Sequence, residues 1–302
     1  MPNIQVQKLK TIGGHSDCVY TLEKGPDNTF FSSGGDGVIA QWDFNDLDNG
    51  RMIAKVPSSV YALCFYEERG LLIVGQNFDG LHLIDVVEKK ELGSIQLGTS
   101  AIFDVKVVKD RIFAALANGE VHVLDLTTLE TVEVLRYSDK SARTLSISEK
   151  HGHLAVGYSD NHIRIFKLQD FALLHDIEAH KISVFTVQYS PNERYLVSGS
   201  RDAHLKVWDA AGGYLEHESI VAHMFAINHM SYSPDSKHFV TCSLDKSIKV
   251  WDASTFQLLK VIDKARHAGH GTSVNKVLWT DFNGLLLSAS DDRSISVWDI
   301  KF

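Results

Sequence analysis

The sequence contains little cysteine and no long apolar stretch, and both absences narrow the class of protein. Its 302 residues include three cysteines (Cys18, Cys64 and Cys242), which form no C-x-x-C pair. A disulfide framework is therefore excluded, and a reducing, cytoplasmic compartment is expected. No segment approaches the roughly 18 consecutive apolar residues of a membrane span. The first residues, MPNIQVQKLK, also lack the basic cluster and apolar run of a signal peptide, so we expect no association with a membrane.

Clustered basic residues and helical periodicity are also missing. The net charge is −8, and no block of Lys and Arg occurs. Binding along a phosphate backbone requires clustered cations that displace counterions, so nucleic acid is not expected as a partner. No apolar stripe with a period of 3.6 residues reaches a useful length, which predicts a chain without helices.

What the sequence does contain is an internal repeat. Four segments share an Asp six residues before a Trp-Asp pair: 36–44, 202–210, 245–253 and 292–300. Weaker copies at 80–86, 120–126 and 160–168 place the Trp-equivalent positions at 42, 84, 124, 166, 208, 251 and 298. Each copy contains short alternating runs between turn residues, which predict four strands, as at 183–189, 194–200, 203–209 and 214–221. One such unit cannot bury both of its faces alone, so the seven units must stack side by side.

Repeats one, five, six and seven resemble those of the WD-repeat family. In that family a His, a Ser or Thr, an Asp and a Trp of one repeat form a hydrogen-bonded tetrad. The chemistry is reasonable, because a buried carboxylate needs donors, and ring, hydroxyl and indole hydrogens supply them. The matching residues are His15, Ser32, Asp36 and Trp42; His180, Ser198, Asp202 and Trp208; His223, Thr241, Asp245 and Trp251; and His270, Ser288, Asp292 and Trp298. In repeat one, Ser32 and Ser33 are hard to choose between.

The resemblance implies an all-β fold, a seven-bladed β-propeller with four antiparallel strands per blade, as a single domain over residues 1–302. Repeats two to four depart from the pattern, with Ile84, Leu124 and Phe166 at the Trp position. Asp160 of repeat four is in place but lacks the family's partners, so these blades are expected to rely on apolar packing. The last repeat is one strand short. The N-terminal strand 5–12 is expected to complete that blade and so to cover its unpaired sheet edge.

One face of such a propeller carries the residues that follow each His. Counting from the His, or by strand alignment, gives a partner-binding face that consists of Tyr20, Tyr61, Phe103, Arg143, Phe185, Asn228 and Asn275, with Arg201 from a turn. Aromatic residues and Arg are enriched in interfaces, although each aromatic ring could equally pack as core. The expected function is a non-catalytic scaffold, a monomer by itself, that binds protein or peptide partners. Two guanidinium groups suit an acidic or carboxylate-bearing segment.

The alternative is an enzyme or small-ligand binder that uses the central channel. No nucleophile, phosphate-loop or dinucleotide motif occurs. The histidines at His151, His153 and His267 lack Cys or carboxylate neighbours at zinc-ligand spacing. Catalytic residues, metal ions and cofactors are therefore not expected. His151 and His153 are predicted to lie on the face opposite the partner-binding face, and His267 is predicted to be a solvated loop residue.

Overall fold

Seven four-stranded antiparallel sheets make up the computed structural model, which describes residues 4–302. Each sheet corresponds to one sequence repeat, and the strand order within it follows the chain except in the last sheet. The predicted all-β, seven-bladed architecture is therefore confirmed. The chain divides into two compact units, one built from the residues up to Ser59 together with His223–Phe302, the other from Val60–Ala222. The single-domain organisation stays a prediction.

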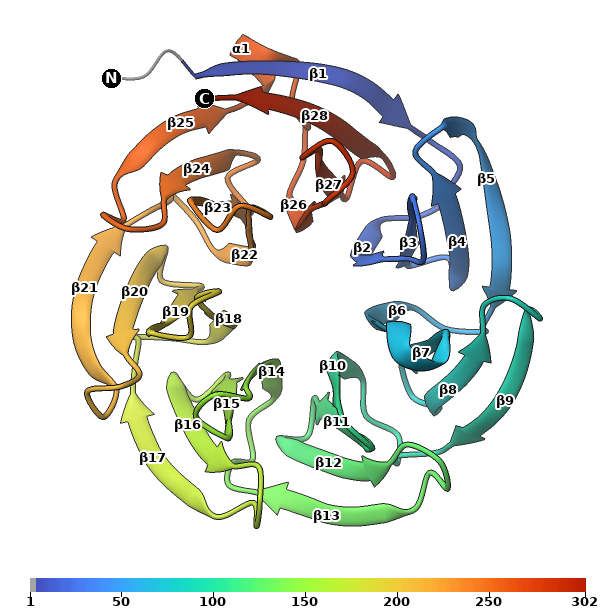
Figure 1. Ribbon diagram of the computed structural model, residues 1–302, viewed down its shortest axis with the longest axis vertical. Helices are drawn as coiled ribbons and strands as arrows, with labels where there is room; N and C mark the ends of the chain where they lie inside the picture. Colours follow the sequence, from blue (N-terminus) through green and yellow to red (C-terminus); the bar gives the residue numbers. More distant parts are fainter. Residues whose placement is uncertain (1–3) are drawn as a thin grey trace. The chain divides into compact units, whose positions relative to one another are not determined.

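The first unit contains blades one, six and seven (Figure 1). Its strands are β1 (Gln5–Ile12), β2 (Val19–Lys24), β3 (Thr29–Gly34), β4 (Val38–Asp43), β5 (Asp46–Lys55), β22 (Ile227–Tyr232), β23 (His238–Ser243), β24 (Ile248–Asp252), β25 (Leu258–Ile262), β26 (Val274–Trp279), β27 (Leu286–Ser290) and β28 (Ile295–Lys301). Strand β1 runs antiparallel to β28, with Val6 opposite Ile300 and Ile12 opposite Ile295. The prediction that residues 5–12 complete the last blade is confirmed, and β1 covers main-chain groups of β28 that would otherwise form an open edge.

The second unit contains blades two to five. Its strands are β6 (Val60–Tyr66), β7 (Leu71–Gln76), β8 (Gly80–Asp85), β9 (Lys90–Ile95), β10 (Ile102–Val108), β11 (Arg111–Leu116), β12 (Glu120–Asp125), β13 (Thr131–Arg136), β14 (Ala142–Ser148), β15 (His153–Tyr158), β16 (His162–Lys167), β17 (Leu173–Glu178), β18 (Val184–Tyr189), β19 (Tyr195–Ser200), β20 (His204–Asp209) and β21 (Leu215–Val221). The second strand of each blade is buried at nearly every residue, because sheets pack on both of its sides. Apolar and small residues therefore run without alternation there.

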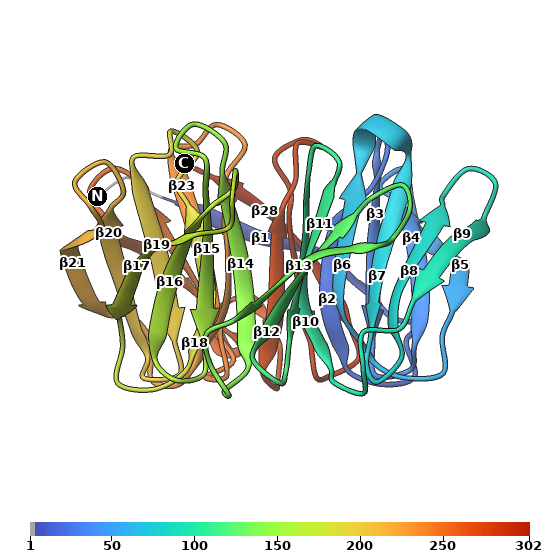
Figure 2. The same ribbon diagram turned by 90° about the horizontal axis from the view of Figure 1, so that it is seen from below.

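Two short helices occur within residues 4–302, where the sequence predicted none. The 3₁₀ helix η1 (Glu67–Arg69) joins β6 to β7 at one end of its blade (Figure 2). Helix α1 (Lys264–His267) lies between β25 and β26 and packs against β1. A single turn leaves no apolar stripe for sequence analysis to detect. His267 is half-buried in α1, so the prediction of a solvated loop residue was wrong. No helix in the described part of the chain is long and apolar enough to span a membrane.

Candidate functional site

The tetrad of blade five forms one hydrogen-bonded chain from the indole to the carboxylate. Trp208 Nε1 donates to Ser198 Oγ at 3.0 Å, and His180 Nε2 lies 2.8 Å from the same oxygen. His180 Nδ1 lies 3.3 Å from the carboxylate of Asp202. Because the hydroxyl accepts from the indole, we assign its own proton to the bond with Nε2, and the imidazole proton to Nδ1, facing the carboxylate.

The tetrads of blades one, six and seven have the same geometry. In each, the His Nε2 lies 2.8 Å from the hydroxyl oxygen, and Nδ1 lies 3.0, 2.9 and 2.9 Å from the Asp carboxylate, respectively. Trp42 Nε1 donates to Ser32 Oγ at 2.8 Å, whereas Ser33 Oγ donates to the carbonyl of Val38. The structure thus places Ser32, not Ser33, in the chain of blade one.

The electrostatics of blade five match these proton positions. Burial raises the pKa of Asp202, but hydrogen bonds from His180 and from the backbone N–H groups of Lys181 and His204 outweigh that effect and hold the pKa well below its usual range. Burial lowers the pKa of His180. The pair is therefore a carboxylate beside a neutral imidazole, which is a structural arrangement that ties the outer turn to the inner strands.

Blades two and three contain polar pairs that sequence analysis missed. The residue two positions before the Trp-equivalent position is a histidine in both blades. His82 lies 3.0 Å from a carboxylate oxygen of Glu91, and His122 lies 2.9 Å from one of Glu120. These blades still rely on apolar packing, as expected, because apolar residues of both blades, Leu124 among them, form one buried cluster, and the polar pairs add to it. A signal was available in the sequence, because both histidines occupy the same position of the repeat.

Blade four uses an arginine at this same position. Arg164 is buried, donates to Asp160 at 2.8 Å and to Asp176 at 3.2 Å, and lies 4.7 Å from the ring of Tyr158. Asp160 also accepts a hydrogen bond from Ser138 at 2.7 Å. Asp160 lacks the family's His and Trp, as expected, but it has two other strong donors. The reason is that a serine and an arginine replace the histidine of the tetrad.

The innermost strand of every blade contains a β-bulge. The residues at which the register shifts are Tyr20, Tyr61, Phe103, Arg143, Phe185, Asn228 and Asn275. These are the seven innermost-strand residues that the sequence assigned to the partner-binding face, and all of them are half-buried. A bulge leaves one residue outside the ladder and re-aims its side chain. The bulge is therefore the local feature that sets these side chains apart from the core.

Four of the bulged residues form a continuous row across the second unit. The ring centroids of Tyr61 and Phe103 are 5.7 Å apart, and the guanidinium of Arg143 lies 4.3 Å from the ring of Phe103. The same guanidinium lies 4.9 Å from the ring of Phe185. Their strands β6, β10, β14 and β18 are neighbours in this order (Figure 1). We call Tyr61, Phe103, Arg143 and Phe185 the aromatic row.

The aromatic row carries positive charge without a carboxylate to balance it. Nε of Arg143 donates to Ser159 Oγ at 3.0 Å, but neither Arg143 nor the exposed Arg201 forms an ion pair within residues 4–302. Burial lowers the pKa of Arg143, and the charge of nearby Arg201 acts in the same direction. An anionic group bound here would relieve this repulsion.

The bulged asparagines of the first unit are already engaged. Asn228 Nδ2 donates to the carbonyl of Val274 at 2.8 Å. Asn275 Nδ2 donates to the carbonyl of Val19 at 3.0 Å and to Asp291 at 2.7 Å. Their amide groups therefore connect neighbouring blades within the unit. The third bulged residue of the first unit, Tyr20, is half-buried in blade one.

Blade six exposes three apolar side chains, two of which, Met224 and Phe225, the sequence prediction omitted. Met224, Phe225 and Leu244 are 81%, 55% and 50% exposed. The backbone N–H of Leu244 donates to the carbonyl of Ala226, which joins the two turns that carry these residues. A comparison of repeats could have found them, because the equivalent residues of blade one are Ser16, Asp17 and Gly35.

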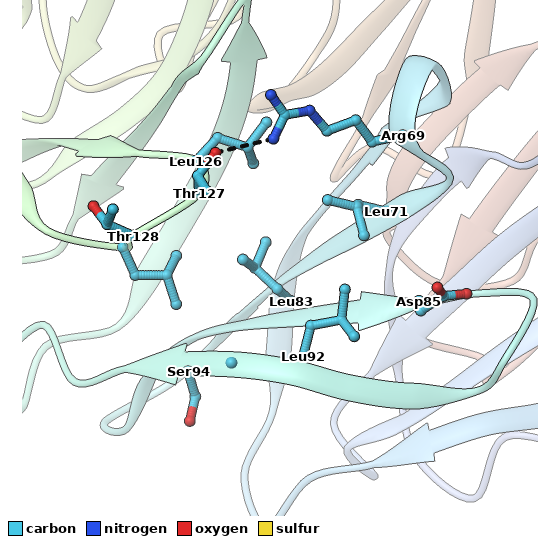
Figure 3. A pocket seen from close by; sticks show the side chains of 11 residues that line it. Arg69, Leu71, Leu83, Asp85, Leu92, Ser94, Leu126, Thr127 and Thr128 are labelled. Carbon is cyan, nitrogen blue, oxygen red and sulfur yellow. Dashed lines mark hydrogen bonds between the residues drawn. The ribbon is translucent and has the colours of Figure 1, made fainter.

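A groove of about 570 Å³ lies between blades two and three (Figure 3). Its apolar lining includes Leu71, Leu83 and Leu92. Arg69 at its rim donates to Thr127 at 3.0 Å and to Asp110 at 2.6 Å. Because this guanidinium is already neutralised, the groove presents aliphatic surface without free positive charge.

Groups suited to metal binding or nucleophilic chemistry do not gather in the described residues. No cluster of three or more His, Cys, Asp or Glu side chains in residues 4–302 is arranged to hold a metal ion. Burial and the charge of Asp291 both raise the pKa of Cys18, so its thiol stays protonated at neutral pH. His151 and His153 stack with ring centroids 5.8 Å apart, at the opposite end of blade four from its bulge.

The fold and the tetrads define a seven-bladed β-propeller built from WD repeats. The family model for the WD domain, G-beta repeat (WD40), matches residues 6–43, 171–209, 216–252 and 262–299. These ranges cover half of the chain and all four tetrad-containing repeats. The protein belongs to the WD40 family, whose propellers generally mediate protein–protein interactions.

Comparisons with individual proteins agree with the family. The chain is 22% identical over 219 residues to the Striatin homolog of Dictyostelium discoideum, which covers 65% of this chain and 26% of that protein. It is 27% identical over 300 residues to the WD repeat-containing protein 26 homolog of Arabidopsis thaliana, which covers 97% of this chain and 42% of that protein. The chain therefore spans less than half of either relative. The WD40 β-propeller domain of Doa1 has the same fold, with a TM-score of 0.85, 16% identity and 97% coverage of both chains.

Proposed function

We propose that the protein is a non-catalytic, cytoplasmic scaffold that is monomeric alone and binds a protein or peptide partner on the aromatic row. The observation that carries this proposal is the guanidinium of Arg143, which contacts two aromatic rings and has no carboxylate partner in residues 4–302. Rings and a guanidinium held by packing are characteristic of interface hot spots, because little side-chain entropy is lost on binding.

The partner that suits this surface is a segment with a carboxylate next to an aliphatic side chain. Arg143 and the exposed Arg201 supply donors for the carboxylate, while Tyr61 and Phe103 supply apolar area. The net charge of −8 repels acidic segments at long range. The attraction must therefore be local, and added salt should weaken binding only modestly.

The alternative of an enzyme or channel ligand site receives no support from the row. Guanidinium groups remain protonated at neutral pH and serve neither as general base nor as nucleophile. Asp291, in the turn between β27 and β28, accepts a hydrogen bond from Asn275 at 2.7 Å.

A peptide selection tests the proposal with a defined probe. Random peptides displayed on phage should enrich sequences that combine Asp or Glu with Leu, Ile or Val. The double variant Phe185→Leu/Arg201→Gln should lose binding to the selected peptides with an almost unchanged melting temperature. Arg194→Gln is the matched control, since its guanidinium lies 4.9 Å from the Tyr195 ring at the other end of blade five. Binding that survives the double variant but is lost in the control would place the partner on the opposite face.

A further inference from the structure

A second hollow, of about 490 Å³, lies between blades three and four. It is lined by the turns β10–β11 and β14–β15 and by the end of β16, which puts it at the opposite end of these blades from the bulges. Val108, Phe113 and Leu168 form its apolar wall. Phe113 is almost fully buried and packs edge-on against Phe171, with the ring centroids 6.2 Å apart. The wall is therefore a preformed apolar surface, and the volume falls in the range typical of small-molecule sites.

Positive charge dominates the rim of this hollow. Lys109 and Lys167 are exposed lining residues, and neither forms an ion pair with a carboxylate of the described chain. Arg111 also lines the hollow, but its guanidinium donates to Asp125 at 2.7 Å and is neutralised. Glu149 is the one lining carboxylate in the described chain. Two ammonium groups against one carboxylate leave a local positive charge on a chain whose net charge is −8.

Two imidazoles complete the rim in fixed orientations. His151 Nε2 donates to the carbonyl of Glu193 at 2.8 Å. His153 Nδ1 lies 2.8 Å from the hydroxyl of Tyr214, which meets the hydroxyl of Tyr189 at 2.6 Å. These bonds hold both rings in place before any ligand arrives, which reduces the entropy lost on binding.

The positively charged groups of this region repel one another. Burial lowers the pKa of His153, and the nearby charges of His151, His175 and Lys167 act in the same direction. A bound anion would reduce this repulsion, whereas a bound cation would increase it. The adjacent groove at blades two and three differs in this respect, because its Arg69 is paired with Asp110.

We propose that this hollow binds a small organic anion, namely a single carboxylate, sulfonate or phosphate group on an aromatic or branched aliphatic body. Lys109 and Lys167 hold the anionic group, and the body packs on Val108, Phe113 and Leu168. The site is independent of the partner-binding row and does not depend on the proposed scaffold function. Its ligand class follows from the pairing of an apolar wall with uncompensated ammonium groups.

A fluorescence titration with anilinonaphthalene sulfonate tests this site, because the dye combines an aromatic body with one sulfonate. The wild-type chain should bind one dye saturably, and the double variant Lys109→Glu/Lys167→Glu should bind it about tenfold more weakly. Lys89→Glu/Lys90→Glu is the matched control with the same change in net charge. Lys89 is a turn residue with φ of 52°, close to the 53° of Lys109. The control should change the affinity by less than about twofold.

Two further measurements locate the site and its selectivity. The uncharged analogue phenylnaphthylamine should bind the wild type and the Lys109→Glu/Lys167→Glu variant alike, because it has no anionic group to lose. The dye should also slow amide exchange in residues 108–111 and 149–153 but not in residues 87–90. Equal weakening by the two double variants, an absence of saturable dye binding, or protection confined to other segments would each overturn the proposal.

Discussion

Replacing His180 with alanine should lower the free energy of unfolding by about 2–4 kcal/mol. The imidazole is fully buried, so its removal leaves a cavity and also breaks the bonds to Ser198 and Asp202. The Ser198 hydroxyl loses the acceptor of its proton, which is a buried polar defect. Asp202 keeps backbone N–H donors from Lys181 and His204, each at 2.9 Å. The carboxylate is therefore not orphaned, and the loss stays below that of an unpaired buried charge.

Urea unfolding followed by tryptophan fluorescence measures this loss, because Trp208 lies in the same tetrad. The melting temperature should fall by roughly 2 °C for each kcal/mol in a chain of this size. The control is His204→Ala, whose side chain is 28% exposed and whose Nδ1 bonds to the carbonyl of Asp202 at 2.9 Å. This change should cost less than about 1 kcal/mol. Equal losses in the two variants would refute the role given to the tetrad.

Acidification, truncation and a core substitution test other features of the fold. Burial lowers the pKa of His223, while hydrogen bonds hold the pKa of Asp245 below its usual range even though burial raises it. On acidification the unfolded chain therefore binds protons before the folded chain does, below about pH 6.5 at His and below about pH 4 at Asp. The urea midpoint should fall in these two stages. A rise in the midpoint would contradict the assigned protonation. Deleting residues 1–12 uncovers the edge of β28. The melting temperature should fall, or light scattering should detect aggregates. An unchanged thermal transition would show that β1 contributes little to stability. Leu124→Trp should lower the urea midpoint, because the site is already filled and the indole would meet Ala114 instead of a hydroxyl. A gain in stability would show that packing there is loose.

The number of blades and the strand boundaries could be read from the sequence because both depend on local patterns. Turn residues and alternating apolar positions recur with the repeat, and the predicted strands of blade five agree with β18 to β21 to within one residue at each end. The placement of residues 5–12 also followed, since an unassigned strand and an incomplete repeat leave one arrangement in which both are paired.

The choice between neighbouring residues was decided by tertiary structure. Ser32 and Ser33 are adjacent in β3 and therefore point to opposite faces of the sheet. The register that sets Phe30 opposite Trp42 determines which hydroxyl meets the indole. Repeat one by itself does not contain this information, because register depends on pairing with a strand formed later in the chain. The other tetrads do contain it, since the hydroxyl lies ten residues before the Trp in all four.

The residues of the candidate site could be predicted from the sequence, whereas the contacts between them could not. Counting from the His of blade five and aligning the innermost strands of blades two to four was sufficient to choose the residues of the aromatic row, since the bulge recurs at the same place in every innermost strand. The contact of Arg143 with rings from the blades on either side depends on packing between residues about 40 positions apart. The bond between Asp160 and Ser138, 22 positions apart, and the wall of Val108, Phe113 and Leu168 are likewise contacts between separate segments of the chain. Such contacts depend on how neighbouring sheets twist and pack, which only the folded chain determines.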